Sequence, residues 1–207
     1  MLSGLAAMVI AYLIGGIPFG LLIVRLMTGA DVRASGSGNI GATNVLRTAG
    51  RMAGVLTLLL DVGKGFLCVW LASVMTGGSE AWSSQAWMSA AAFAVMAGHA
   101  FPVWLRFKGG KAVATCTGAF LYLTPLPLLA VMLLFALLVA STRYLSLGSI
   151  VAAGLLPVAC LIILHPEWPV LASALAAAVL VVWRHKDNIT RIRAGTENVF
   201  RFQRTAA

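Results

Sequence analysis

Long apolar runs separated by short polar segments dominate this sequence. Runs of suitable length for a membrane crossing cover 5–28, 52–76, 82–101, 112–141, 147–164 and 168–184. A helix needs roughly 20 apolar residues to cross the hydrocarbon core. The chain is 60% hydrophobic and 10% charged, whereas soluble domains carry about 25% charged residues. We therefore expect lipid to be the solvent of much of this protein.

The apolar runs favour helices over the strands of a barrel. They are rich in Leu, Ala and Val and lack the alternating pattern of membrane strands. Only helices or closed barrels satisfy the backbone within lipid. No repeat, low-complexity stretch or linker interrupts the chain, so we expect one all-α membrane domain over 1–207. The run at 5–28 lacks a preceding basic region and is predicted to be the first membrane helix, not a cleaved signal peptide.

The fourth run decides the number of crossings. It is too long for one span, and it contains Pro125 and Pro127, which interrupt helices. We expect two helices, at about 112–123 and 126–141. The first is short for a full crossing, which is compatible with a tilted or partly re-entrant helix.

Basic residues indicate the orientation, because short cytoplasmic loops are enriched in Lys and Arg. They lie in segments 25–51 and 102–111, at Arg143 and in the tail after Trp183. The connections 77–84 and 165–169 contain acidic Glu80 and Glu167 but no Lys or Arg. Two crossings over 112–141 place every basic segment on one side. The prediction is about seven helices, with the N-terminus outside and the C-terminus cytoplasmic.

The first polar segment, 31–50, reads DVRASGSGNIGATNVLRTAG. Glycines allow close approach of backbone N–H groups to a ligand, consecutive amides form anion-binding nests, and Arg is a bidentate phosphate donor. A plain polar loop between helices is the alternative. The candidate residues in this segment are Arg33, Ser35, Gly36, Ser37, Gly38, Asn39, Gly41, Thr43, Asn44 and Arg47.

The second polar segment, 98–115, reads GHAFPVWLRFKGGKAVAT. Lys108 and Lys111 flank the pair Gly109–Gly110 just before a predicted helix, whose N-terminus attracts anions. Topology-determining charge is the alternative explanation for these lysines. His99 is more simply interpreted as a structural histidine.

The third polar segment, 184–197, reads RHKDNITRIRAGTE and follows the last apolar run directly. His185 and Asn188 are three residues apart and share a face if the helix continues. His185 could move a proton near neutral pH, and Asn188 could hold a hydroxyl or phosphoryl oxygen. The arginines of this segment, Arg184, Arg191 and Arg193, could instead contact anionic lipid headgroups.

Two pairs outside these segments are also candidates. Asp61 and Lys64 lie inside an apolar run, where a charge is costly and is paired or functional. Their spacing predicts a structural ion pair. Ser146 and Ser149, at the start of the 147–164 run, either cap that helix or line a site.

The three segments together resemble the motifs of the bacterial acyl-phosphate:glycerol-3-phosphate acyltransferase family, over the full chain length. The sequence departs from the family at Ala112, where Gly is common. The resemblance implies transfer of a fatty acyl group from acyl phosphate to the sn-1 hydroxyl of glycerol 3-phosphate, which yields lysophosphatidic acid and phosphate. This is the first acylation of phospholipid synthesis, at the cytoplasmic face of the bacterial inner membrane.

The resemblance and the residue chemistry together give a set of expected roles. Ser37, Arg47, Lys108 and Lys111 would bind phosphate, with Ser37 and Lys108 close to the reacting atoms. His185 and Asn188 would orient the reacting groups, and the base is either His185 or the substrate's own phosphate. Further substrate contacts are expected from Ser35, Gly38, Asn39, Gly41, Thr43, Asn44, Gly109, Gly110, Ser146 and Ser149. By the same resemblance Glu197 is structural.

Other functional classes fit the sequence less well. The net charge of +9 is better explained by membrane topology than by nucleic-acid binding, since the basic residues lie between apolar runs. A small-anion transporter would need polar residues along several helices, and an assembly factor would not need three phosphate-suited segments. The three cysteines lie inside apolar runs and are expected to pack as apolar residues. We expect no metal or organic cofactor, and a monomer in the membrane.

Overall fold

A computed structural model describes residues 1–77 and 83–200. These residues form helices and short connections, which confirms the prediction of an all-helical, polytopic membrane bundle. Glu80, Arg201 and Arg204, which contributed to the topology prediction, lie outside the described residues. The elements in chain order are α1 (Leu2–Gly15), α2 (Phe19–Thr28), η1 (Val32–Ala34), α3 (Ala42–Thr76), α4 (Ser84–Ala100), η2 (Val103–Leu105), α5 (Val113–Leu123), α6 (Pro125–Thr142), α7 (Leu145–Leu164), α8 (Trp168–Arg184) and α9 (Lys186–Arg193).

The first apolar run is two helices, not the single helix expected over 5–28. The chain leaves helical geometry before Pro18, which has φ −88° and ψ 73° and precedes α2. Proline has no N–H to donate and clashes with the preceding turn. The break leaves the carbonyl of Ile17 outside both helices, where it accepts a bond from a side chain of α3.

The expected break in the fourth run is confirmed. Thr124, with φ −145° and ψ 69°, separates α5 from α6, and Pro125 occupies the first position of α6. Proline is favoured there because an N–H at the first helical position would have no partner within the helix, so the N–H that proline lacks is not needed. With 11 residues, α5 is the short helix that the sequence predicted.

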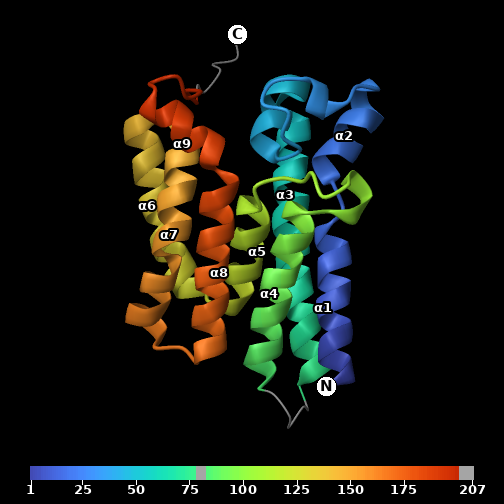
Figure 1. The fold of residues 1–207 in the computed structure, drawn as a ribbon, viewed down its shortest axis with the longest axis vertical. Helices are drawn as coiled ribbons and strands as arrows, with labels where there is room; N and C mark the ends of the chain where they lie inside the picture. Colours follow the sequence, from blue (N-terminus) through green and yellow to red (C-terminus); the bar gives the residue numbers. More distant parts are fainter. Residues whose placement is uncertain (78–82, 201–207) are drawn as a thin grey trace.

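Glycines bring several helices into close backbone contact, a packing mode common in membranes. A Cβ at Gly98 of α4 would overlap the carbonyl of Tyr12 in α1, and one at Gly118 of α5 would overlap the carbonyl of Val62 in α3. Figure 1 shows α1, α3, α4 and α5 together, with α6, α7 and α8 beside them.

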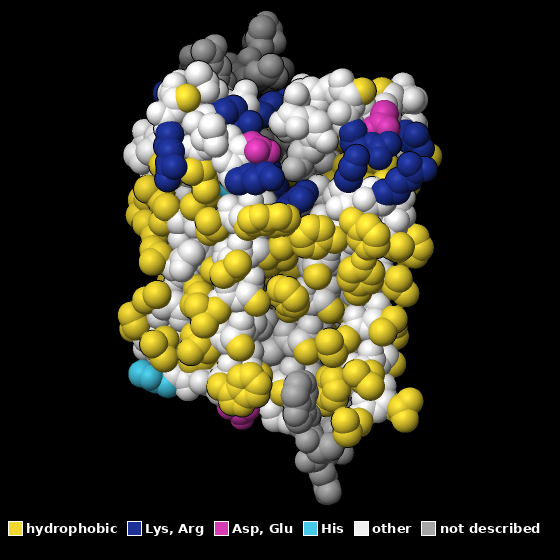
Figure 2. All heavy atoms as spheres, in the orientation of Figure 1, with side chains coloured by type: hydrophobic (Ala, Val, Ile, Leu, Met, Phe, Trp, Pro, Cys, Tyr) yellow, Lys and Arg dark blue, Asp and Glu magenta, His cyan; other side chains and the backbone are white. Residues whose placement is uncertain are grey.

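On the face that Figure 2 shows, exposed apolar side chains form a band across the middle of the bundle, and charged side chains lie toward its ends. Lys and Arg side chains cluster at the upper end, above the hydrophobic band, in the view of Figure 2. Within the described residues, five segments are long and apolar enough to cross a membrane, and the α8–α9 pair, bent by 57°, makes a sixth candidate. The five are α1 together with α2 (Leu2–Thr28), α3, α4 together with η2 (Ser84–Leu105), α6 and α7, so the run at 5–28 is still one candidate span despite its internal break. The helix α5 is apolar but shorter. The chain is therefore a multi-pass membrane protein.

Candidate functional site

One polar cavity brings the three predicted segments together. It has a volume of about 470 Å³. Its lining residues come from the loop before α3 and the start of α3, from the segment just before α5, from the α8–α9 bend with α9, and from the segment after α9. They are Gly36, Ser37, Asn39, Arg47, Lys111, Trp183, Arg184, Lys186, Asp187, Asn188, Arg191 and Asn198.

Asn44, in the first turn of α3, shapes the loop that contributes Ser37. Its amide nitrogen donates to the backbone carbonyls of Val32, Ser35 and Asn39, at 2.9–3.2 Å. Its Oδ1 accepts the N–H of Ser37 at 2.9 Å. Buried and fully bonded, Asn44 holds the loop in place, and the Ser37 backbone N–H is not free for an anion.

Two glycines of this loop adopt backbone conformations that favour glycine. Gly36 and Gly38 have φ values of 61° and 68°, a region that other residues enter at a cost. A Cβ at Gly36 would also overlap Oδ1 of Asn44. The tight turn therefore depends on both glycines, and it presents Ser37 at the cavity wall.

Two arginines of the first segment have different environments. Arg33 forms an ion pair with Asp31, with 2.6 Å between Nη2 and Oδ2. Hydrogen bonds from Arg33 lower the pKa of the Asp31 carboxyl to about 2. Arg47, one turn after Asn44 on α3, lines the cavity. Arg47 is therefore the arginine of this segment that can meet a bound anion there.

The pair Gly109–Gly110 is held by backbone bonds to the end of α4. The N–H of Gly109 donates to the carbonyl of Ala100, and that of Gly110 donates to the carbonyl of His99. The backbone N–H groups of both glycines are therefore occupied within the protein. On the other side, Arg184 donates to the carbonyls of Gly110 and Gly109 at 2.9 and 2.6 Å.

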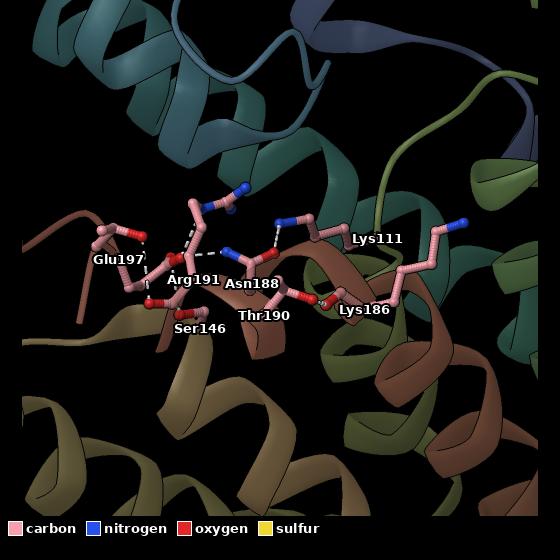
Figure 3. Close-up of polar contacts among 8 residues, drawn as sticks. Lys111, Ser146, Lys186, Asn188, Thr190, Arg191 and Glu197 are labelled. Atoms are coloured by element: carbon pink, nitrogen blue, oxygen red, sulfur yellow. Dashed lines mark hydrogen bonds and ion pairs between the residues drawn. The ribbon is translucent and has the colours of Figure 1, made fainter. Parts of the chain in front are cut away.

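Lys111 enters a hydrogen-bonded chain that joins α5 to the C-terminal segment (Figure 3). Its Nζ donates to Oδ1 of Asn188. The amide nitrogen of Asn188 donates to Oε1 of Glu197 at 2.7 Å, and Ser146 donates to the same oxygen at 3.0 Å. Arg191 contacts Oε2 at 2.8 Å. Glu197 thus fixes the Asn188 amide so that its oxygen faces Lys111.

Burial and hydrogen bonding determine the charge states of Lys111 and Glu197 in this hydrogen-bonded series. Burial lowers the pKa of the Lys111 amine to about 8, since the charged form loses solvation. Burial opposes ionisation of Glu197, but hydrogen bonds from Asn188, Ser146 and Arg191 outweigh it and lower the pKa of this carboxyl. Glu197 therefore stays charged, and Lys111 changes its charge close to physiological pH.

His185 is buried just beyond α8, and its Nδ1 lies 2.7 Å from the carbonyl oxygen of Val181. A carbonyl only accepts, so Nδ1 carries a proton and Nε2 is the basic nitrogen of the neutral ring. Burial, with a smaller contribution from nearby Lys111, lowers the pKa of His185 to about 4. The imidazole is therefore neutral at physiological pH.

The predicted site residues fall into two groups. Those at the cavity wall are Ser37, Asn39, Arg47, Lys111 and Asn188, together with Gly36, Arg184 and Arg191 from the same polar segments. Those in the surrounding structure, outside the wall, are Ser35, Gly38, Gly41, Thr43, Asn44, Lys108, Gly109, Gly110, Ser146, Ser149 and His185. Lys108 is exposed, and Ser149 donates to the carbonyl of Leu145 and borders a small apolar cavity.

Sequence reasoning missed Trp183, Lys186, Asp187 and Asn198 as lining residues. Lys186 and Asp187 lie between His185 and Asn188, in the first turn of α9, and this position was the available signal. Asn198 gave none. Among residues 1–77 and 83–200, no group of three His, Cys, Asp or Glu side chains is arranged to hold a metal ion.

Comparisons with known proteins agree on one family. Residues 5–195 match the model of the family described as glycerol-3-phosphate acyltransferase. Proteins of that name from Trichlorobacter lovleyi and Geobacter sulfurreducens are 49% and 45% identical over 201 and 202 residues, which is 97% of this chain and 100% of each relative.

Two solved structures also superimpose closely. A crystal structure of PlsY (YgiH), an integral membrane glycerol 3-phosphate acyltransferase in its glycerol 3-phosphate form, gives a TM-score of 0.87 at 36% identity over 96% of both chains. Its lysophosphatidic acid form gives 0.85 at 35% identity over 96% of this chain and 95% of that one. This chain therefore belongs to the glycerol-3-phosphate acyltransferase family and is a multi-pass membrane acyltransferase.

Proposed function

We propose that this enzyme transfers a fatty acyl group from acyl phosphate to the sn-1 hydroxyl of glycerol 3-phosphate, giving lysophosphatidic acid and inorganic phosphate. The observation that carries the proposal is the cation-lined cavity at the basic end of the bundle, next to the apolar band. Such a position serves one soluble phosphate substrate and one lipid substrate. The crystal structures of PlsY in its glycerol 3-phosphate and lysophosphatidic acid forms support a site that accepts both a soluble phosphate compound and a lipid.

The cavity offers several groups for phosphate. Arg47, Lys111 and Lys186 supply positive charge from three different elements, and Ser37 supplies a hydroxyl at the wall. Guanidinium and ammonium groups bind phosphate through charge-assisted hydrogen bonds. Because both substrates carry a phosphate, we assign these residues to phosphate binding and to stabilising the charge that develops on the leaving phosphate.

The transfer needs one proton acceptor. The substrate hydroxyl oxygen attacks the acyl carbonyl carbon, the bond from that carbon to the phosphate oxygen breaks, and the hydroxyl proton leaves. His185, with Nε2 unprotonated, is one acceptor, and the phosphate of the substrate is the other. Acyl phosphate is already activated, so positioning and charge neutralisation supply most of the catalysis.

We also propose that the basic end faces the cytoplasm of a bacterial inner membrane and that residues 1–207 act as one monomeric domain. The positive-inside tendency supports this orientation. Inside-out vesicles should convert added glycerol 3-phosphate, and sealed right-side-out vesicles should not. Equal rates in both preparations would contradict the assigned side.

The activity is tested with purified protein in detergent. Palmitoyl phosphate plus glycerol 3-phosphate should release phosphate and form lysophosphatidic acid, whereas palmitoyl-CoA with glycerol 3-phosphate should give no product. Nuclear magnetic resonance of the product distinguishes sn-1 from sn-2 acylation. Arg47→Ala should raise the KM for glycerol 3-phosphate at least tenfold, while Arg51→Ala, four residues further along the chain, past the kink at Gly50 and outside the cavity wall, serves as the control. No product from folded protein would refute the proposal.

A further inference from the structure

A buried ionic cluster lies outside the cavity wall, in the membrane-spanning part of the bundle. The Nζ of Lys64 is 2.8 Å from Oδ1 of Asp61, one turn earlier on α3. It is also 3.0 Å from the carbonyl of Ile17, in the α1–α2 break, and 3.0 Å from Nδ1 of His99, near the end of α4. One ammonium group therefore connects three elements of the fold.

The orientation of the His99 ring follows from this contact. An ammonium group only donates, so Nδ1 of His99 accepts from Lys64, and the proton of the neutral ring is on Nε2. A Cβ on Gly110 would overlap Nε2, so the ring packs directly against the Cα of Gly110. The carbonyl of His99 also accepts the N–H of Gly110. The residue after Gly110 is Lys111.

A charged cluster is a costly way to join helices in lipid, and membrane interiors contain ionisable residues mainly at functional sites. Gly98 already packs α4 tightly against α1, and Gly118 packs α5 against α3, without any charge. The cluster makes a connection that these apolar contacts do not. It ties the α1–α2 break and α3 to the peptide that carries Lys111.

We propose that Asp61, Lys64 and His99 are positioning residues for acyl transfer, which hold the Gly109–Gly110 peptide so that Lys111 reaches the cavity. The inference rests on the proposed role of Lys111 in phosphate binding. Arg184 holds the carbonyls of the same peptide from the cavity side. The peptide is thus fixed between Arg184 and the His99 ring.

The test begins with His99→Ala, which removes the ring beside Gly110. We expect kcat/KM for glycerol 3-phosphate to fall at least tenfold in protein that remains folded in detergent. We also expect the alkaline limb of the pH–rate profile, assigned to Lys111, to move to higher pH as the freed loop exposes the amine to water. Ser173→Ala is the matched control, because it removes a buried α8–α4 hydrogen bond without touching the loop.

A double variant gives a readout that general destabilisation would not. Gly110→Ala alone should lower kcat/KM strongly, because its Cβ overlaps the His99 ring. In His99→Ala/Gly110→Ala the ring is gone, so the double variant should retain about the kcat/KM of His99→Ala. Losses that multiply in the double variant would refute direct positioning through this contact.

Other outcomes also decide the question. Wild-type kcat/KM and an unmoved alkaline limb in His99→Ala would overturn the proposal. If that variant does not fold, His99→Asn, which preserves an acceptor for Lys64, is measured in the same way. Failure of both variants to fold would make the cluster a folding element and refute the positioning role. An inactive wild-type enzyme would instead refute the proposed function.

Discussion

Lys111 makes the activity of this enzyme sensitive to pH in a range that can be calculated. With a pKa of about 8, the amine is about nine-tenths charged at pH 7, half charged at pH 8 and about one-tenth charged at pH 9. The charged form is the one that binds phosphate and prevails below the pKa, so activity is lost as the pH rises. We expect kcat/KM for glycerol 3-phosphate to fall about tenfold between pH 7 and pH 9.

The assay follows initial rates of phosphate release at subsaturating glycerol 3-phosphate, since kcat/KM reports the ionisation of the free enzyme. The substrate phosphate, with a second pKa of about 6, hardly changes its charge in this interval. Lys111→Arg places a permanently charged group at the position and should remove the limb, whereas Lys186→Arg changes another lysine of the cavity and should keep it. A flat wild-type profile, or the same limb in Lys111→Arg, would refute the reasoning.

Three further predictions concern single residues. His185→Ala and His185→Gln should abolish any acidic limb of the pH–rate profile that arises from the imidazole; a limb that persists in both variants would assign the base to the substrate phosphate. Glu197→Gln should lower the free energy of unfolding by about 2 kcal/mol near neutral pH, because Glu197 accepts hydrogen bonds as a charged group. Folding lowers the pKa of Glu197, so its stabilisation is fully present above the pKa of the unfolded chain and is lost as the pH falls through the folded value. Thermal unfolding measured over a series of decreasing pH values should show the largest difference between variant and wild type near neutral pH and a smaller difference in acid. Ala112 has a φ of 60° and is buried, so Ala112→Gly should leave stability within about 1 kcal/mol, since relief of backbone strain is offset by the lost methyl group and the added flexibility of the unfolded chain. Ala112→Val should cost about 2 kcal/mol or more, and equal melting temperatures for the two variants would contradict this account.

The coarse architecture could be predicted because it depends on one-dimensional properties of the chain. The lengths of the apolar runs predicted the membrane helices, and Pro125 indicated the break before α6. The break at Pro18 was missed because apolar residues continue on both sides of it, although Gly15, Gly16 and Pro18 together were a visible signal. Hydropathy measures solvent preference and does not detect a change of backbone direction within lipid.

The site was only partly predictable, because contacts between distant segments decide what each polar group does. The sequence indicated Lys111 and Asn188 as candidates, and the structure brings them into contact. It also suggested Gly109 and Gly110 as substrate contacts, whereas the carbonyls that accept their backbone N–H groups become visible only once the end of α4 is placed. Resemblance identified the chemistry, but the partners of each group required three-dimensional structure.

The shortness of α5 has a consequence for how the chain enters the bilayer during synthesis. Its 11 residues extend about 16 Å as a helix, roughly half of the hydrocarbon thickness. The turn at Thr124 is buried against protein, where its hydroxyl accepts a contact from the thiol of Cys160 on α7. A segment of this length is a poor independent insertion signal, so α5 should leave the translocon only when α3 is already in place to receive it. Membrane integration of this enzyme is then ordered by tertiary contacts, and a Gly118→Leu variant, whose side chain blocks the close contact of α5 with α3, should leave Cys116 accessible to water-soluble thiol reagents.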